Sequence, residues 1–389
     1  MRFLIHMGDP YPNESPGAIR MRTFYEALKA AGHEVGVLAP ESRNVQFPDV
    51  IGFKTIPLKS KSVINRLLNQ LSIGFGSLKA AKAFGSADVV ITTSPPALIS
   101  IFGWRIARNM NAKLVYDVRD IWPDVAWEMG IFSRSGIYGR VFEWNRNFML
   151  AHSDLVMAVS HGKVEKLKRY CPDADVVYVT NGLDEKFLEN KENPDIVERF
   201  GLDRRSACVY IGNLGLAQGL TQLLHIAKRA KDIALPIQFL LFGSGIEAGM
   251  LRKFAQENGL DNVIFPGHLP NADMYTVLKH AQMSFVSLVN ENLRDSVPTK
   301  MFEALGAGCP VLLAAAGESA QILAETGLGA AVTPNDEESL WNAFVRMYEQ
   351  RDAYSAKQAH AKDIIFTKYS RQKAAKQMVF EITKRFQKR

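Results

Sequence analysis

The stretch ACVYIGNLGLAQGL, residues 207–220, joins a short apolar run to a loop that contains three glycines. The run Ala207–Ile211 has the length and composition of a buried strand, and a helical pattern begins just after the loop. Backbone amides in such a loop can approach and hold an anion, helped by the positive end of the helix. The stretch therefore predicts a strand–loop–helix unit in which Gly212 begins an anion-binding loop. A flexible loop without a ligand is the alternative.

The same alternation of short apolar runs and helical periods extends through the chain in both directions, which predicts βαβ units and parallel sheets. The expected strands are Arg2–His6, Glu34–Ala39, Asp88–Thr92, Lys113–Asp117, Leu155–Val159 and Val176–Val179, then Ala207–Ile211, Ile237–Phe242, Asn262–Phe265, Met283–Val286 and Pro310–Ala314. The polar segment Asp184–Asn193 separates the two series and is the expected linker. The fold class is therefore α/β, with parallel-sheet domains over 1–185 and 186–369 and a basic C-terminal helix within 370–389. Parallel sheets bind ligands at the carboxyl ends of their strands, so a cleft between the domains is the expected active-site position.

The net charge of +7 is concentrated in two segments. Residues 50–87 carry six basic residues and no acid, and residues 370–389 carry seven basic residues and one acid. The remainder of the chain is mildly acidic. No aromatic-interleaved basic surface or reader motif accompanies this charge, so nucleic acid is not an expected partner.

Within the first basic segment, Ser62–Phe84 mixes apolar and basic residues as a helix in an anionic membrane interface does. A helix that packs its apolar side on a sheet, with solvated lysines, is the alternative.

Cysteine and histidine usage gives no sign of a disulfide framework or a metal site. The cysteines at 171, 208 and 309 are far apart and odd in number, and the eight histidines show no HxxxH or HExxH spacing. The N-terminus turns polar after about six residues, too soon for a signal peptide. The longest apolar stretches fall short of the ~20 residues that a membrane-spanning helix needs. We therefore expect a soluble, reduced, cytoplasmic protein without a bound metal.

Two motifs in the second half could contact a nucleotide. Gly243 and Gly245 follow an expected strand and match GxGxxA, but no acid ends the next strand to hold a ribose, so a tight turn beside a ligand cleft is favoured over NAD binding. Thr299 begins an expected helix, and Glu303 lies one turn further along the same face. A capping box would place the acid at Phe302, so capping does not explain Glu303. Glu303 is suited to hold sugar hydroxyls, and surface solvation is the alternative.

A third motif, DVRDIWPD at residues 117–124, follows an expected strand in the first half. Three acids, an arginine and a tryptophan at a carboxyl edge indicate a binding surface. A structural network of arginine and aspartate is the alternative.

The chain further contains, in order, SPGAIRMRTFYEALKAAGHEV, TTSPPALIS, VYDVRDIWPD, SDLVMAVS, TNGLD, YIGNLGLAQGL, FGSG, SVPTKMFEALGAGCPVL and GESAQILAETGLG. Together these segments resemble the retaining glycosyltransferases of family GT4, and within it the WbuB-like branch of bacterial polysaccharide and lipopolysaccharide biosynthesis. The resemblance implies the GT-B fold, in which two Rossmann-like domains face each other across a cleft and the C-terminal helix crosses back to the first domain. It is expected to bring the 370–389 cluster near the first basic segment.

The resemblance also has departures from the general GT4 pattern. The family's Glu-x7-Glu pair is here Asp295 and Glu303, and Asn213 and Gln218 stand where many members carry an arginine and a lysine for the diphosphate. Lys300 is the expected replacement for that basic pair.

Arg20 or Arg294 are expected to assist Lys300. Members of the family usually carry a His-Asp pair in the first domain. At the matching positions this chain has Arg119 and Asp120, so no histidine is available there.

The resemblance also implies a mechanism. The acceptor hydroxyl would attack the donor sugar from the same face from which the diphosphate leaves. Three groups would stabilise the departing phosphate: the glycine loop that starts at Gly212, the Lys300 side chain, and the backbone amides at the start of the Thr299 helix. Glu303 would hold the ribose and Asp295 a hydroxyl of the donor sugar.

In the first domain, Gly17 would let the N-terminal loop approach the diphosphate, and Asp120 would orient the acceptor hydroxyl. Members of this fold need no bound metal or other cofactor.

The expected reaction moves a sugar from a nucleotide sugar, UDP-linked and N-acetylated in this branch, to a glycan or a polyprenyl-diphosphate-linked acceptor. Such an enzyme would work at the inner face of the plasma membrane. The alternatives are a nucleotide-sugar epimerase on the same scaffold and a non-catalytic protein that binds nucleotide sugars.

Overall fold

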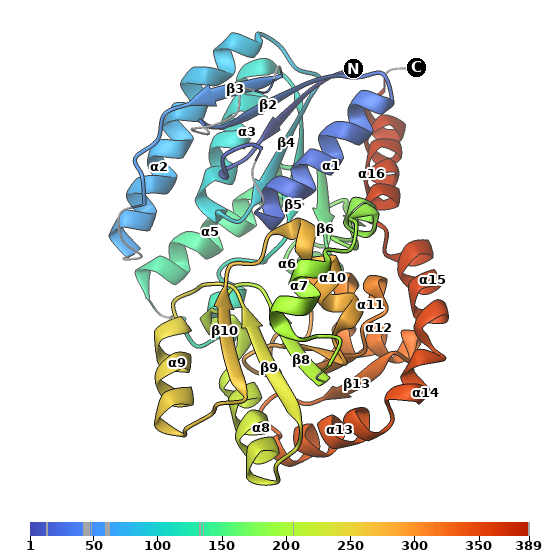
Figure 1. The fold of residues 1–389 in the computed structure, drawn as a ribbon. Helices are drawn as coiled ribbons and strands as arrows, with labels where there is room; N and C mark the ends of the chain where they lie inside the picture. Colours follow the sequence, from blue (N-terminus) through green and yellow to red (C-terminus); the bar gives the residue numbers. More distant parts are fainter. Residues whose placement is uncertain are drawn as a thin grey trace. The chain divides into compact units, whose positions relative to one another are not determined.

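A computed structural model of the chain describes residues 1–12, 15–41, 47, 49–58, 63–131, 134, 136–204 and 206–387. The chain forms two compact units: unit 1 is Met1–Asn181 with Arg371–Arg389, and unit 2 is Gly182–Ser370. The sequence placed the domain boundary at 185/186, close to this division. Each unit is an α/β domain built on a parallel sheet (Figure 1).

Unit 1 contains a seven-stranded parallel sheet in the order β3-β2-β1-β4-β5-β6-β7. Its strands are β1 (Arg2–His6), β2 (Glu34–Pro40), β3 (Val50–Phe53), β4 (Val89–Ser94), β5 (Lys113–Val118), β6 (Leu155–Ala158) and β7 (Val176–Tyr178). Its helices are α1 (Pro16–Ala30), α2 (Val63–Ala80), α3 (Ser100–Met110), α4 (Asp124–Glu128), α5 (Ile137–His152), α6 (His161–Tyr170) and α16 (Arg371–Phe386), with short 3-10 turns η1 (Ala81–Phe84) and η2 (Ala97–Ile99).

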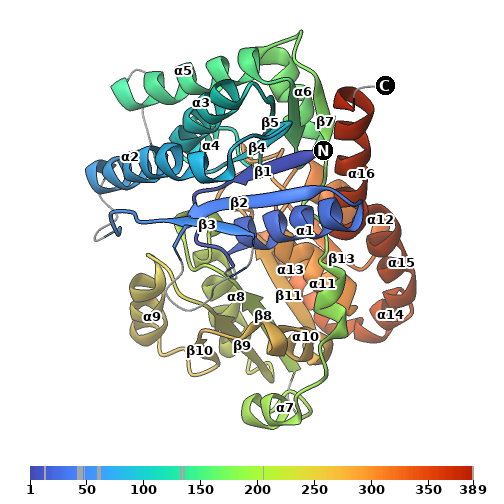
Figure 2. The same ribbon diagram turned by 90° about the horizontal axis from the view of Figure 1, so that it is seen from above.

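Alternating residues of the unit 1 strands face two separate cores. Phe3 and Ile5 of β1 belong to the core beneath α1 and α16, whereas Leu4 belongs to the core beneath α2, α3, α5 and α6. The two layers of helices are visible on either side of the sheet in Figure 2. Because apolar side chains cover both faces, the central parts of these strands read as short apolar runs in the sequence.

The C-terminal helix packs on unit 1, as the sequence predicted. Ala374, Ala375, Met378 and Ile382 of α16 are buried in the same core as α1. The two basic segments consequently lie on opposite faces of the unit 1 sheet, since α2 and η1 cover the other face. The expectation that they lie near each other is wrong, because one returning helix can cover only one side of a sheet.

Unit 2 contains a six-stranded parallel sheet in the order β10-β9-β8-β11-β12-β13. Its strands are β8 (Ser206–Ile211), β9 (Ile237–Phe242), β10 (Val263–Gly267), β11 (Met283–Ser287), β12 (Val311–Ala314) and β13 (Gly329–Val332). Its helices are α7 (Pro194–Phe200), α8 (Thr221–Asp232), α9 (Ala248–Glu257), α10 (Asn271–His280), α11 (Thr299–Ala307), α12 (Glu318–Thr326), α13 (Glu337–Glu349), α14 (Arg351–Ser355) and α15 (Gln358–Lys368), with η3 (Glu185–Glu189) and η4 (Leu216–Gln218).

The predicted fold class, two parallel-sheet domains of the Rossmann type, is confirmed. Two strands, β3 and β13, were not predicted, and both lie at the edge of their sheet. In the described part of the chain, no helix has the length and apolar character needed to cross a lipid bilayer.

Candidate active site

The loop after β8 is the first component of the site in unit 2. Gly212 has φ = +147° and Gly219 has φ = +56°, conformations that favour glycine. The loop turns sharply at these two residues and leads through η4 into α8. The predicted strand–loop–helix unit is therefore present.

The loop after β9 lies directly against the β8 loop. A Cβ atom on Gly243 would lie 1.8 Å from the Gly212 carbonyl oxygen, and one on Gly245 would lie 2.1 Å from the Leu214 carbonyl oxygen. The amide of Leu214 also donates to the Ser244 carbonyl at 2.9 Å. These contacts require glycine at both positions, so the GxGxxA motif is explained by backbone packing between two loops.

Lys300 lies beneath the β8 loop and is the cation of this region. Its Nζ donates to the Tyr210 hydroxyl at 2.7 Å and to Gln218 Oε1 at 2.5 Å, and it lies 4.2 Å from the centre of the Tyr210 ring. A Cβ on Gly212 would lie 3.2 Å from this Nζ. The structure thus brings together the loop, Gln218 and Lys300, three elements that the sequence assigned to the diphosphate.

Burial changes the pKa of Lys300. Desolvation lowers the pKa of the ammonium to about 7, and the nearby Glu303 carboxylate partly opposes this shift. Near neutral pH the side chain therefore exists in both protonation states, and an anion bound above it would favour the charged state. A cation of this kind is poised for a phosphate group.

Tyr210 and Glu247 were not predicted as site residues. The Tyr210 hydroxyl donates to the Asn213 carbonyl at 2.7 Å, and burial together with the Glu247 carboxylate raises the pKa of Tyr210. Burial also raises the pKa of Glu247, and its Oε2 is buried without a hydrogen-bond partner in the described part of the chain. A tyrosine at the end of an apolar run and a glutamate inside a turn motif gave no separate signal in the sequence.

The two acids of the candidate site lie on helix α11 (Glu303) and in the turn that precedes it (Asp295). The helix begins at Thr299 after Pro298, without a side-chain cap, and Glu303 lies one turn inside it. Glu303 and Asp295 are both partly exposed, as groups that meet a ligand must be. Arg294, an expected helper of Lys300, is exposed, and its backbone carbonyl accepts a hydrogen bond from the Glu318 amide.

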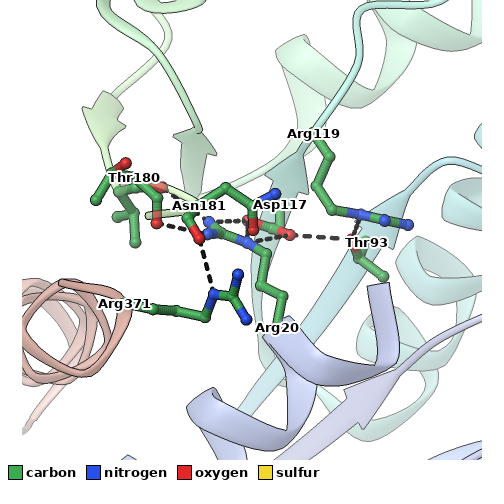
Figure 3. A network of polar contacts seen from close by, with 8 residues as sticks. Arg20, Thr93, Asp117, Arg119, Thr180, Asn181 and Arg371 are labelled. Carbon is green, nitrogen blue, oxygen red and sulfur yellow. Dashed lines mark hydrogen bonds and ion pairs between the residues drawn. The ribbon is translucent and has the colours of Figure 1, made fainter. Parts of the chain in front are cut away.

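In unit 1, a polar network lies at the carboxyl ends of β4 and β5 (Figure 3). Asp117 is fully buried and accepts hydrogen bonds from Arg20 Nη2 at 2.8 Å and from Thr93 Oγ1 at 3.0 Å. Arg119 in turn donates from Nε to Thr93 Oγ1 at 3.2 Å. The network therefore holds the Arg119 guanidinium at this edge of the sheet.

The prediction that Arg20 assists at a diphosphate is wrong. Its side chain is fully buried, forms an ion pair with Asp117, and donates to the carbonyl oxygens of Val179 and Thr180. These partners occupy the guanidinium inside unit 1, so it cannot present a donor to an external phosphate. A cation–π contact with Phe24 at 4.6 Å completes its environment.

Gly17 and Asp120 lie at the same edge of unit 1. A Cβ on Gly17 would lie 2.5 Å from Asp9 Oδ2 and 2.7 Å from Arg119 Nη1, so the glycine admits two charged side chains to the first turn of α1. Ser15 caps this turn by accepting from the Ala18 amide at 3.2 Å. Asp120 is partly exposed.

The sequence left two interpretations of the DVRDIWPD motif open, a binding surface and a structural network of arginine and aspartate. Different residues of the motif fit each of them. Asp124 is buried and pairs with Arg146 at 2.7 Å, so it and Asp117 belong to structural networks. Arg119 and Asp120 remain accessible to a ligand. Within the described residues, no group of three histidine, cysteine or acidic side chains is placed to hold a metal ion.

Two parallel-sheet units of the Rossmann type, with a C-terminal helix that returns to the first unit, have the architecture of the GT-B class. Comparison with family models agrees: residues 17–182 match the glycosyl transferase 4-like domain, and residues 194–363 match the glycosyl transferases group 1 domain. Together the two matches span most of the chain, and the chain belongs to the glycosyltransferases of this two-domain type.

Relatives and solved structures are consistent with this family. The chain is 23% identical over 294 residues to a protein of Pseudomonas aeruginosa named as a probable glycosyltransferase, WbjE, covering 74% of this chain and 73% of the relative. It is 26% identical over 298 residues to a protein of Escherichia coli K12 named provisionally as a colanic acid biosynthesis glycosyl transferase, WcaI, covering 72% of each.

Among solved structures, a sucrose-phosphate synthase from Thermosynechococcus elongatus has a TM-score of 0.84 at 19% identity, with both chains fully covered. Anabaena HepE in complex with UDP-glucose has a TM-score of 0.74 at 14% identity, covering 98% of this chain and 99% of that one. These likenesses establish the fold.

Proposed function

We propose that the chain is a retaining glycosyltransferase that moves a sugar from a UDP-linked donor to a glycan or lipid-linked acceptor in the assembly of a bacterial surface polysaccharide. The proposal rests on one observation above the others: Lys300 lies directly beneath the β8 glycine loop, hydrogen-bonded to Tyr210 and Gln218. That arrangement offers a cation where the usual basic pair of the glycine loop is missing.

The role proposed for Lys300 is to stabilise the leaving group. When the bond between the anomeric carbon and the diphosphate oxygen breaks, negative charge develops on that oxygen. A fixed cation and the amides of the β8 loop and of the first turn of α11 would stabilise this charge. Asn213 and Gln218 would then shape the loop around the phosphates without contributing charge.

The sugar and the ribose would be held by acids of unit 2. Glu303 on α11 would accept hydrogen bonds from the ribose hydroxyls, and Asp295 would accept from a hydroxyl of the donor sugar. The partial exposure of both residues supports these roles. The Glu303 carboxylate also favours the charged form of Lys300, which couples ribose binding to the charge at the phosphates.

Asp120 of unit 1 would orient the acceptor hydroxyl. The acceptor oxygen forms the new bond to the anomeric carbon, and its proton passes to the departing phosphate oxygen, so the step balances without another reactant. We propose no resident metal or cofactor, since Lys300 would supply the positive charge at the diphosphate. Full activity in the presence of EDTA would support this, and loss of activity restored by a divalent ion would contradict it.

The names of relatives support the choice of donor and pathway class. HepE has been solved with UDP-glucose, and WcaI is named for colanic acid biosynthesis. We extend UDP-sugar use and surface-polysaccharide assembly to this chain by that likeness. An N-acetylated sugar, as the WbuB-like resemblance implies, is the donor that we propose to test first.

The test compares transfer by Lys300→Ala and Glu303→Gln with two matched surface variants. Lys279→Ala and Glu338→Gln remove the same kinds of charge from exposed ion pairs elsewhere in unit 2. We expect Lys300→Ala to lower kcat by about 100-fold or more, as loss of a leaving-group donor does. Glu303→Gln should mainly raise KM for the donor, and the surface variants should match the wild type.

Products are identified with a screen of UDP-sugars and a lipid-linked acceptor. A glycosylated acceptor with the donor's anomeric configuration supports the proposal. An inverted product, an epimerised free nucleotide sugar, or wild-type turnover by Lys300→Ala would each overturn it.

A further inference from the structure

The outer face of helices α2, α3 and α5 in unit 1 is unusually apolar and basic at once. The three helices pack side by side over one face of the sheet, with α3 in the middle (Figures 1 and 2). The Phe75 ring of α2 meets Phe102 of α3 at 5.3 Å, and Trp104 of α3 meets Phe148 of α5 at 4.9 Å. The face is therefore one continuous surface.

Large apolar side chains project from this face into solvent. On α5, Ile137, Val141 and Trp144 recur at helical spacing, with Ile137 72% and Trp144 55% exposed. On α2, Leu68 and Phe75 form a second stripe, with Phe75 64% exposed. Isolated exposed apolar residues are ordinary, but two aligned stripes on neighbouring helices indicate a surface that is covered during function.

The charged side chains of the three helices are basic with one exception. Five basic residues of these helices are exposed, namely Arg66, Lys79, Arg105, Arg108 and Arg140, and Lys82 in the η1 turn that follows α2 is the sixth exposed cation. The one acid on the three helices is Glu143, which lies 3.4 Å from Arg146. Arg105 and Arg108 of α3 lie between the two apolar stripes, so cations and apolar side chains alternate across the face.

We propose that this outer α2–α3–α5 face docks unit 1 onto an anionic lipid bilayer. The α2 and α5 stripes would enter the interface between head groups and acyl chains, and the six cations would contact lipid phosphates. A second copy of the chain would bring two like-charged faces together, which opposes self-association. An anionic, partly apolar surface is therefore the partner that this face fits.

The direction of the helices links this docking to catalysis. In a parallel sheet each connecting helix begins at the carboxyl edge of the strands. Ile137 in the first turn of α5 consequently lies towards the edge that carries Arg119 and Asp120. Docking of the face brings this edge to the head-group layer, where the polar end of a lipid-linked acceptor is found. This consequence rests on the proposed function, whereas the docking itself does not.

The experiment measures co-sedimentation of the full chain with vesicles of phosphatidylcholine alone and of phosphatidylcholine mixed equally with phosphatidylglycerol. The apolar variant is Ile137→Ser/Trp144→Ser, and the charge variant is Arg105→Glu/Arg108→Glu. The matched control is Phe380→Ser, which removes an exposed aromatic residue that lies against Lys384 on the opposite face of the sheet. Far-UV circular dichroism and melting temperature confirm that each variant is folded.

We expect the wild type and Phe380→Ser to bind the mixed vesicles and not phosphatidylcholine alone. The apolar variant should bind about tenfold or more weakly at unchanged salt dependence, because it loses two inserted side chains. The charge variant should bind the mixed vesicles weakly, and its affinity should fall little further at about 0.5 M salt. Salt screens the electrostatic attraction to the lipids, which this variant has already lost. Trp144→Phe should retain binding.

Several results would overturn the docking proposal. These are absence of wild-type binding to the mixed vesicles, an equal loss in Phe380→Ser, and a dimer that the apolar variant dissociates while vesicle binding is unchanged. Affinity for UDP is measured in parallel and should be the same in all variants. Loss of UDP binding by the wild type would instead contradict the proposed function and leave the docking proposal standing.

Discussion

The Lys300 ammonium lies 2.5 Å from the side-chain carbonyl oxygen of Gln218 in the glycine loop. The two residues are 82 positions apart in the chain. They come together because strand β8 ends, and helix α11 begins, at the carboxyl edge of the same sheet. A lysine at the start of a neighbouring helix thus contacts a residue of the glycine loop, as our proposal for Lys300 requires.

The depressed pKa of Lys300 predicts that UDP binding depends on pH. The pKa of about 7 means that the free site loses its charge as pH rises above 7, so the dissociation constant of UDP should increase towards tenfold per pH unit. In Lys300→Arg the charge is permanent and the profile should be flat. Isothermal titration calorimetry between pH 6.5 and 9 measures both.

The control for this prediction is Lys279→Met, which removes an exposed lysine of unit 2 and should keep the wild-type profile. A wild-type affinity that is constant above pH 7, or one that improves with pH, would contradict a role of the Lys300 charge in binding.

Gly243 and Gly259 predict a clear difference in the cost of an added methyl group. Both residues have positive φ, but a Cβ on Gly243 would lie 1.8 Å from a backbone oxygen, whereas one on Gly259 would meet only Lys231 Nζ at 3.7 Å. Gly259→Ala should cost about 1–2 kcal/mol for the left-handed conformation alone. Gly243→Ala should cost more and should weaken UDP binding by displacing the β8 loop. Urea unfolding and UDP titration test this, and equal costs would contradict it.

The central strands were predictable because both faces of each sheet are covered. Strand β9 is buried along its whole length and is apolar at every position except Gln238, and its predicted bounds agree with the structure. Strand β3 reads VIGF and strand β13 reads GAAV, and both lie at sheet edges with partly exposed residues. Short, glycine-containing edge strands carry little hydrophobic signal, so periodicity missed them.

Residue type and sequence position could suggest members of the candidate site. They could not show which side chains are buried and paired inside the fold. Lys300 was predicted from the family resemblance and from its place at an expected helix start, and the structure places it against the glycine loop. Arg20 was misassigned because its sequence neighbours do not reveal Asp117, its partner 97 residues away. Glu247 was missed because only the folded chain shows that one of its oxygens is buried without a hydrogen-bond partner among the described residues.

The buried pair of Arg20 and Asp117 predicts a stability effect without a binding effect. Asp117→Asn leaves the guanidinium of Arg20 buried without its counter-charge, which should destabilise unit 1 by about 3–5 kcal/mol. Affinity for UDP should be unchanged, because Arg20 has no access to a ligand. The control Glu338→Gln breaks an exposed pair with Arg229 and should cost less than about 1 kcal/mol. A loss of UDP affinity in Arg20→Met that exceeds its loss of stability would restore the role predicted from the sequence.

His6 predicts how the stability of unit 1 depends on pH. The side chain is fully buried, its Nδ1 lies 3.0 Å from Thr92 Oγ1, and burial lowers its pKa to about 4. Between pH 6.5 and 4 the unfolded chain binds a proton that the folded chain does not, so stability decreases as pH falls through this window. From pH 7 to pH 5 the loss attributable to His6 should be about 2 kcal/mol. Urea unfolding of the wild type and of His6→Gln at both pH values isolates the contribution of His6 to the free energy of unfolding, since the variant lacks the titrating group. Parallel curves for the two proteins would contradict the prediction.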